Sequence, residues 1–332
     1  MKRVGWFEIA VAEVADRPPE DGYTVALVGQ DTLDRIGSPA WRDAIGVSPV
    51  LFNTRGMLIE TSEVRRQLLQ FTTVCWHDVA SVAGVARLLM EARDEITKVL
   101  NGANGEVRVV IDANSMPKAL FAALLGMLIR TRIAAKIDVL YQSFEYLYRA
   151  FPLNEVFAGS DFQQDINDVE FLFSAVPYAE GKYKSALGRH IIMLCGLDYQ
   201  RTMAKLLELE PARVDIVLES EAIALPTALP VFQKCCRHID VDPDRVPIVG
   251  RTDLDTNFRA IESALMNGRD EGLHSIIIAS SGKPATLAAT LFSVLQSETP
   301  LLVTIPDRVV ELEARANGPM LLYRLTDRTA IA

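Results

Sequence analysis

Apolar and polar positions follow a pattern that occurs twice in this chain, and its clearer copy runs from Val107 to Leu128. The apolar run Val109–Ile111 is short enough for a strand buried on both faces. Polar residues end the run, and Pro117 then favours the first turn of a helix, where its missing N–H would be unpaired anyway. Leucines spaced four apart follow on one helical face: Leu120, Leu124 and Leu128. The pattern predicts a strand, a polar turn and a buried helix, the unit from which doubly wound α/β sheets are built.

The second copy of this pattern runs from Ser275 to Leu295. Pro284 stands 167 positions after Pro117, and Ile276–Ile278 matches the earlier apolar run. The same offset pairs Gly29 with Gly196, Asp31 with Asp198, Val50 with Val217 and Leu51 with Leu218. Because one ungapped offset of about half the chain relates these positions, the sequence indicates a tandem duplication.

Strand and helix patterns alternate in both halves, which predicts a parallel sheet with helices on both faces. In the first half we expect strands at Val4–Val11, Tyr23–Val28, Val47–Phe52, Phe71–Cys75 and Lys136–Tyr141, and helices at Glu63–Gln70, Val79–Leu100 and Ser143–Ala150. In the second half we expect strands at Val169–Val176, His190–Cys195, Val214–Glu219, His238–Val241 and Leu301–Ile305, and a long helix at Thr256–Met266. The expected fold is α/β, with two Rossmann-like units at residues 1–150 and 169–332 and a connector at 151–168.

Composition narrows the classes of partner and compartment. The net charge is −9 and no dense Lys/Arg run is present, so duplex nucleic acid is not an expected ligand. Glu8 interrupts the apolar N-terminal run, which argues against a signal peptide, and Ala119–Ile129 is too short to span a bilayer. The four cysteines do not have the spacing of a disulfide framework, which fits a reducing compartment. We expect a cytoplasmic protein with no membrane contact.

Candidate binding residues lie where the predicted strands end. In an open α/β sheet ligands bind beyond the carboxyl ends of strands, where the strand order reverses, which is between the first and fourth strands if each half has the order 3-2-1-4-5. The residues at these ends are Gly29, Gln30, Asn114 and Ser115 in the first half, and Gly196, Arg201, Ser280, Ser281, Gly282 and Lys283 in the second. Glycine permits close approach, a helix start offers N–H groups to an anion, and lysine adds charge. The structural alternative is that these residues form tight turns and helix caps.

Other chemistry has weaker motif support. Asp31, Asp112 and Asp198 are candidate catalytic bases, but the chain lacks the Gly-x-Ser-x-Gly, Walker A and GxGxxG motifs. The spacings Cys75-Trp76-His77 and Cys235–His238 do not match a zinc module, so we expect no metal and no cofactor. The segment Val176–His190 is either a solvated loop or a gate over the site.

A family resemblance adds an expectation about function. The stretch IIIASSGKPATLAATL from Ile276 to Leu291 resembles the strand, turn and helix of CRISPR-associated Rossmann-fold (CARF) sensor domains, in which a Gly-Gly-Thr-Lys-like turn faces a cyclic oligonucleotide. Two such units in one chain resemble the SAVED sensors, which are fused CARF-like pairs. The sequence departs from the pattern, because Ser281-Gly282-Lys283 replaces Gly-Thr-Lys and Ser115-Met116-Pro117 has no lysine. The resemblance implies nucleotide sensing, in the setting of antiviral defence.

Two classes of function stay open from the sequence. The first is a non-enzymatic sensor that binds a nucleotide or another phosphorylated small molecule and acts through a separate effector protein. The second is a nucleotide-processing hydrolase that uses one of the strand-end aspartates, and a structural subunit of a larger complex is a third possibility.

Overall fold

The computed structural model of this 332-residue chain divides into two units, Met1–Phe144 with Ala316–Ala332, and Glu145–Arg315. The residues that the structure describes are 2–5, 7–13, 23–29, 49–53, 72–75, 90, 93–94, 97, 106–146, 171–182, 184, 186–197, 199–224, 228–296, 298–306 and 314–329. Among them, no helix combines the length and the apolar character that a membrane crossing requires.

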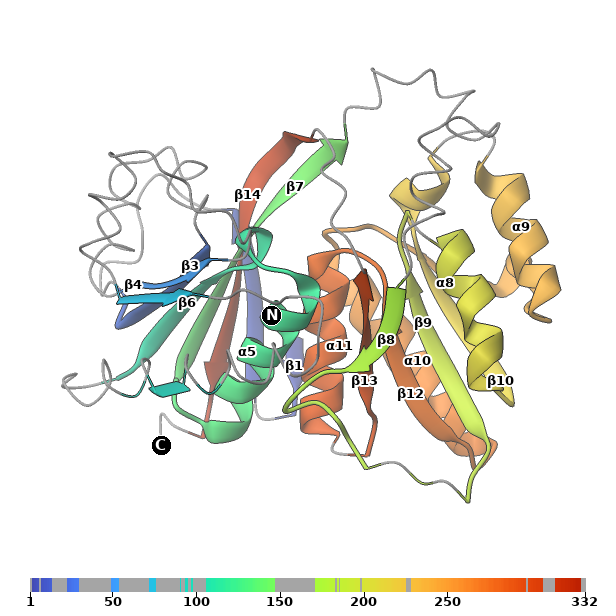
Figure 1. Ribbon diagram of the computed structural model, residues 1–332, viewed down its shortest axis with the longest axis horizontal. Helices are drawn as coiled ribbons and strands as arrows, with labels where there is room; N and C mark the ends of the chain where they lie inside the picture. Colours follow the sequence, from blue (N-terminus) through green and yellow to red (C-terminus); the bar gives the residue numbers. More distant parts are fainter. Residues whose placement is uncertain are drawn as a thin grey trace. The chain divides into compact units, whose positions relative to one another are not determined.

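The second unit contains a six-stranded sheet in the order β11-β10-β9-β12-β13-β8 (Figure 1). Its strands are β8 (Phe171–Ala175), β9 (Arg189–Cys195), β10 (Arg213–Glu219), β11 (Ile248–Val249), β12 (His274–Ala279) and β13 (Leu301–Pro306). The strands from β9 to β13 run parallel, and β8 pairs antiparallel with β13. Counted along the chain from β9, the parallel strands have the order 3-2-1-4-5, so the order reverses between β9 and β12.

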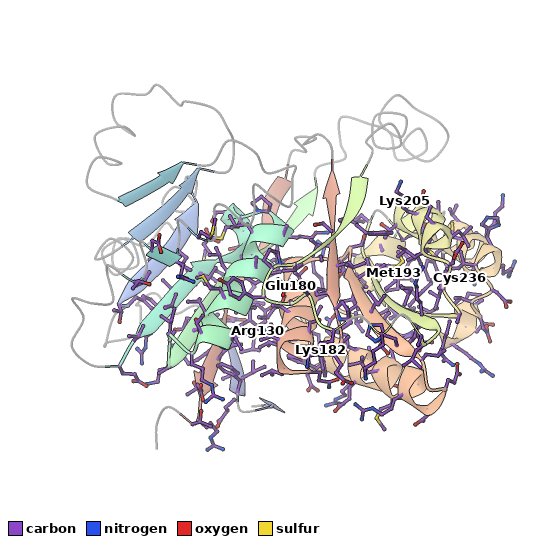
Figure 2. The ribbon with its side chains drawn as sticks, turned by 60° about the horizontal axis from the view of Figure 1, so that its bottom comes forward. Arg130, Glu180, Lys182, Met193, Lys205 and Cys236 are labelled. Carbon is purple, nitrogen blue, oxygen red and sulfur yellow. The ribbon has the colours of Figure 1, made fainter. Side chains whose placement is uncertain are left out.

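Helices cover both faces of this sheet, with α8 and α9 on one face and α10 and α11 on the other (Figure 1). The helices are α8 (Tyr199–Leu206), α9 (Ala228–His238), α10 (Leu254–Asp270) and α11 (Lys283–Leu295). On the α8–α9 face, Met193 and Cys236 belong to one buried cluster together with Tyr199 (Figure 2). On the opposite face, the rings of Phe258 and Phe292 pack edge to face with centroids 5.4 Å apart. Two covered faces explain why β9 is a continuous apolar run.

The first unit contains an eight-stranded sheet in the order β1-β2-β14-β7-β6-β3-β4-β5. Its strands are β1 (Lys2–Val4), β2 (Phe7–Glu13), β3 (Val25–Gly29), β4 (Pro49–Asn53), β5 (Thr72–Cys75), β6 (Arg108–Asp112), β7 (Lys136–Tyr146) and β14 (Ala314–Asp327). The strands from β3 to β7 run parallel and again have the order 3-2-1-4-5. The last strand of the chain, β14, lies between β2 and β7 and runs antiparallel to β2.

The helix predicted after Pro117 is α5 (Lys118–Thr131). Pro117 is its N-cap rather than its first residue, with φ −56° and ψ 150°. The helix ends at Arg132, whose left-handed φ of 52° directs its N–H to the carbonyl of Ile129. Every residue from Ala119 to Ile129 is buried, as expected for a helix that is apolar on all sides.

An ion pair with a buried carboxylate joins β14 to β7. Asp138 on β7 is fully buried, and Arg324 on β14 donates from Nε to Oδ1 at 2.9 Å and from Nη2 to Oδ2 at 3.0 Å. The Tyr23 hydroxyl donates to Oδ2 at 3.0 Å, and burial together with this carboxylate raises the pKa of Tyr23. Two parallel bonds from one guanidinium specify geometry as well as energy, so this pair adds to the backbone pairing that places β14 in the sheet.

The predicted fold class is confirmed, since both units are α/β with mostly parallel sheets. Some boundaries differ. The third strand of the second half is β11 rather than His238–Val241, because α9 extends to His238. Where the sequence predicts a helix at Ser143–Ala150, the first residues of that segment are the end of β7. The second unit was expected to extend to residue 332, but β14 pairs with strands of the first unit. The expected connector 151–168 and the expected helix Glu63–Gln70 lie outside the described residues.

Candidate functional site

The candidate site of the second unit lies at the carboxyl ends of β9 and β12. Gly196 follows β9, and the turn Ser280–Gly282 joins β12 to α11. The Ser280 N–H donates to the Leu194 carbonyl at 3.0 Å, which joins the two strand ends. A Cβ on Gly196 would lie 3.1 Å from Ser281 Cα, so glycine permits this close approach. Four of the residues proposed from the sequence therefore meet at one place.

The two serines of this turn differ in their hydrogen bonding. Ser280 Oγ lies 2.9 Å from Thr202 Oγ1 of α8, and both residues are buried. Ser281 is 2% exposed, and among the described residues its Oγ has no hydrogen-bond partner. An unpaired buried hydroxyl costs about 1–3 kcal/mol, so such a group calls for an explanation, and a bound ligand supplies one.

A carboxylate that the sequence analysis did not identify completes the site. Glu219 ends β10, is 2% exposed, and accepts a hydrogen bond at Oε1 from the Gly282 N–H at 2.6 Å. Its Oε2 lies 3.4 Å from Nε of Arg251, whose side chain is 11% exposed. A Cβ on Gly282 would lie 2.7 Å from Glu219 Oε1, so any larger residue here would displace the carboxylate from this position. The sequence signal for Glu219 was an acidic residue at the end of an apolar strand, β10, that pairs with β9.

The other residues proposed for the second unit are only partly described. Lys283 is the first residue of α11 and is half-buried. Arg201 lies in α8, but its side chain is outside the described set, as is all of Asp198. The helix start therefore contributes backbone, one lysine and the serine turn to the site.

The equivalent turn of the first unit uses its polar side chains in hydrogen bonds of its own. Asp112 Oδ1 accepts from the Asn114 N–H at 3.0 Å, and Ser115 Oγ donates to the Asp112 carbonyl at 3.0 Å. Asn114 accepts from the Gln142 N–H at 2.6 Å and donates to the Gln142 carbonyl at 2.9 Å. This is the structural alternative considered from the sequence. Gly29 ends β3, whereas Gln30 and Asp31 lie outside the described residues.

A Ser–His–Asp arrangement lies at the opposite, amino edge of the second sheet. His190 Nδ1 is 2.9 Å from Ser275 Oγ, and His190 Nε2 is 3.2 Å from Asp215 Oδ2. These distances are those of a catalytic triad. However, His190 is fully buried, and a Cβ on Gly268 of α10 would lie 2.1 Å from Nδ1 and 2.7 Å from Ser275 Oγ. Because His190 is fully buried and α10 packs against its ring, the imidazole is closed to solvent, and we assign the arrangement to stability.

Asp215 is the centre of that network. Arg213 donates to both of its oxygens, at 3.3 and 3.0 Å, and Asn267 donates to Oδ2 at 3.0 Å. Arg213 also pairs with Glu271. Burial alone would raise the pKa of Asp215, but the hydrogen bonds from His190, Arg213 and Asn267 outweigh it and hold the pKa well below its usual range.

The segment Val176–His190, for which the sequence allows a loop or a gate, also lies at the amino edge of the second unit's sheet. Val176 N–H donates to the Leu301 carbonyl, and the Leu301 N–H donates to Ala179, so the segment is tied to the first residue of β13. Glu180 and Lys182 lie on it (Figure 2). It is therefore remote from the carboxyl edge of its own sheet, and the gate interpretation is wrong for this unit.

The cysteines of α9 pack as apolar side chains. Cys236 is fully buried, and burial raises its pKa to about 12. In the described part of the chain, no three His, Cys, Asp or Glu side chains converge as metal ligands. His77, which the sequence considered beside Cys75, is outside that part.

No protein-family model and no curated protein matches the chain. Among solved structures, the chain is similar to a type III CRISPR defence DNA nuclease activated by cyclic oligoadenylate, at 10% identity and a TM-score of 0.46, over 85% of this chain and 66% of that one. It also matches an A-type ketoreductase from a modular polyketide synthase (14% identity, TM-score 0.22) and an A1-type ketoreductase (15%, TM-score 0.21), each over 88% of this chain and 80% of the other.

At such identities and TM-scores the comparisons assign no function to this chain. Function is therefore inferred from the residues of the site itself.

Proposed function

We propose that this chain is a sensor that binds a nucleotide or another phosphorylated small molecule at the carboxyl edge of the second sheet. The observation that carries the proposal is the Ser280–Lys283 turn, which lies at the reversal of strand order and holds a buried Ser281 hydroxyl without a partner among the described residues. The turn leads into the start of α11, where backbone N–H groups and the helix dipole favour an anion.

The same strand order in both units supports descent from a tandem duplication. Among the described residues the Ser–His–Asp arrangement offers no accessible base, since its His190 is fully buried against α10, and this favours binding over turnover. A protein that binds without reacting must pass its state to a partner, so the proposal includes a separate effector protein and the bacterial defence setting that the CARF resemblance implies.

Calorimetric titration of the full chain with AMP, ADP, ATP and cyclic tri- and tetra-adenylate tests the proposal. We expect at least one of these to bind, and the Lys283→Ala variant to lose at least about tenfold in affinity, the cost of one charged contact. Lys118→Ala, which removes a lysine from the start of α5 in the first unit, is the matched control. Binding that Lys283→Ala leaves unchanged would remove this site from consideration.

Ser281→Ala gives an independent test because its two effects have opposite signs. If the hydroxyl is reserved for a ligand, its removal relieves an unpaired buried group and raises the free energy of unfolding by about 1 kcal/mol. The same change removes a ligand contact and weakens binding. Ser280→Ala is the control, because its hydroxyl is paired with Thr202 and its loss lowers stability. A loss of stability in both variants would contradict the assignment of Ser281 to the ligand.

A further inference from the structure

The start of α11 holds an internal anion in the place where a ligand's phosphate would bind. The Glu219 carboxylate accepts from the Gly282 N–H at 2.6 Å, and that N–H belongs to the N-cap of the helix. Its second oxygen faces Arg251 at 3.4 Å. One backbone donor and one guanidinium are the groups with which proteins bind a phosphate at a helix start.

Burial makes this carboxylate a strong competitor. Glu219 is 2% exposed and the Arg251 side chain 11%, so water screens neither charge well. A phosphate oxygen that approached Gly282 would come within a few ångströms of a like charge, and like charges at that range repel far more strongly in a poorly hydrated site than in water. A ligand anion must therefore displace Glu219 or bind beside it at a cost.

We propose that Glu219 determines the charge selectivity of this site by competing with the ligand's phosphate for the Gly282 N–H and Arg251. The inference rests on the proposed function, since it concerns the same site. It predicts that a neutral residue of the same shape strengthens the binding of anions, whereas a residue that only anchors the turn would weaken binding when changed.

The test measures the affinity of AMP and of inorganic pyrophosphate for the full chain by calorimetry. Glu219→Gln keeps an oxygen acceptor for the Gly282 N–H and removes the charge, so both probes should bind at least about tenfold more tightly. Glu221→Gln changes the net charge equally two residues away and should change affinity less than twofold. Adding Arg251→Gln to Glu219→Gln should abolish the gain. If Glu219→Gln does not fold, Glu219→Asp withdraws the carboxylate by one methylene and should give a smaller gain.

The outcomes separate the two proposals. Binding by Glu219→Gln that exceeds binding by the parent supports the inference, also where the parent binds neither probe. If the parent binds and Glu219→Gln binds equally or more weakly, the inference fails while the proposed function stands. If no probe or adenylate binds to the parent or to Glu219→Gln, both fail.

Discussion

Substitution of Gly268 by alanine is the sharpest test of the second unit's packing, because two effects predict opposite signs. Gly268 lies near the end of α10, and in an exposed helix Gly→Ala stabilises by about 0.5–1 kcal/mol. Here the new Cβ would lie 2.1 Å from His190 Nδ1 and 2.7 Å from Ser275 Oγ, whereas ordinary contacts begin at 3.4 Å. The imidazole must therefore move by more than about 1 Å, which a close-packed interior resists.

The cost follows from what His190 holds in place. Overpacking costs about 1–3 kcal/mol. Moving the ring also weakens its hydrogen bonds to Ser275 and Asp215, each worth about 1 kcal/mol net and more where a charge takes part. With the gain in helix propensity subtracted, we expect Gly268→Ala to lower the free energy of unfolding by about 2–5 kcal/mol.

Urea unfolding followed by circular dichroism measures this change. Ser263→Ala, at an exposed position of the same helix, is the control and should change stability by less than about 0.5 kcal/mol. In a His190→Ala background the clash is gone, so Gly268→Ala should become stabilising, and the double-mutant cycle isolates the contact. If Gly268→Ala stabilises the parent protein, His190 does not lie against α10, and the assignment of the Ser–His–Asp arrangement to stability is wrong.

Three further predictions concern ion pairs and turns. Arg324→Met removes the guanidinium from the buried Asp138 carboxylate, which keeps the Tyr23 hydrogen bond, and should cost about 2–4 kcal/mol in urea unfolding, whereas Arg328→Met, which breaks a more exposed pair, should cost less than about 1. Because folding lowers the pKa of Asp215 below the unfolded value of about 3.9, its stabilisation is complete above about pH 5 and is lost as the pH falls below that value; Asp215→Asn should flatten the acid limb of a stability–pH curve. Asn114→Ala removes two hydrogen bonds to β7 and should cost about 1–3 kcal/mol, while ligand affinity for the second unit's site is unchanged.

The fold was predictable where the apolar pattern was strong and local. The runs that became β9, β12 and α11 are buried on both faces, so their sequences carry the signal directly. The third strand of the second half was placed wrongly because the ungapped offset projected β5 onto residues near His238. There an amphipathic helix, α9, buries Ala228, Phe232 and Cys236 at intervals of four, and the strand comes later as two residues.

The pairing of β14 could not be predicted, because it depends on contacts between distant parts of the chain. Its partners, β2 and β7, lie far away in sequence, and the ion pair that joins it to β7 links Arg324 to Asp138, which are 186 positions apart. A strand pattern shows that a segment is extended and half-buried, but not which edge it joins.

The two turns at the strand ends show why sequence located the site only in part. Their prolines and leucines match, yet Asn114 bonds to the backbone of Gln142, while Ser281 at the same place in the second unit keeps a buried hydroxyl unpaired among the described residues. The types of their side chains made both turns candidate binding sites. Only the hydrogen bonds show that the polar side chain is paired in the first turn and unpaired among the described residues in the second. The Glu219 carboxylate could not be found from a motif, because it reaches the start of α11 from the neighbouring strand β10. The two units thus share a strand order, while the polar side chains at the equivalent turns differ in their hydrogen bonding.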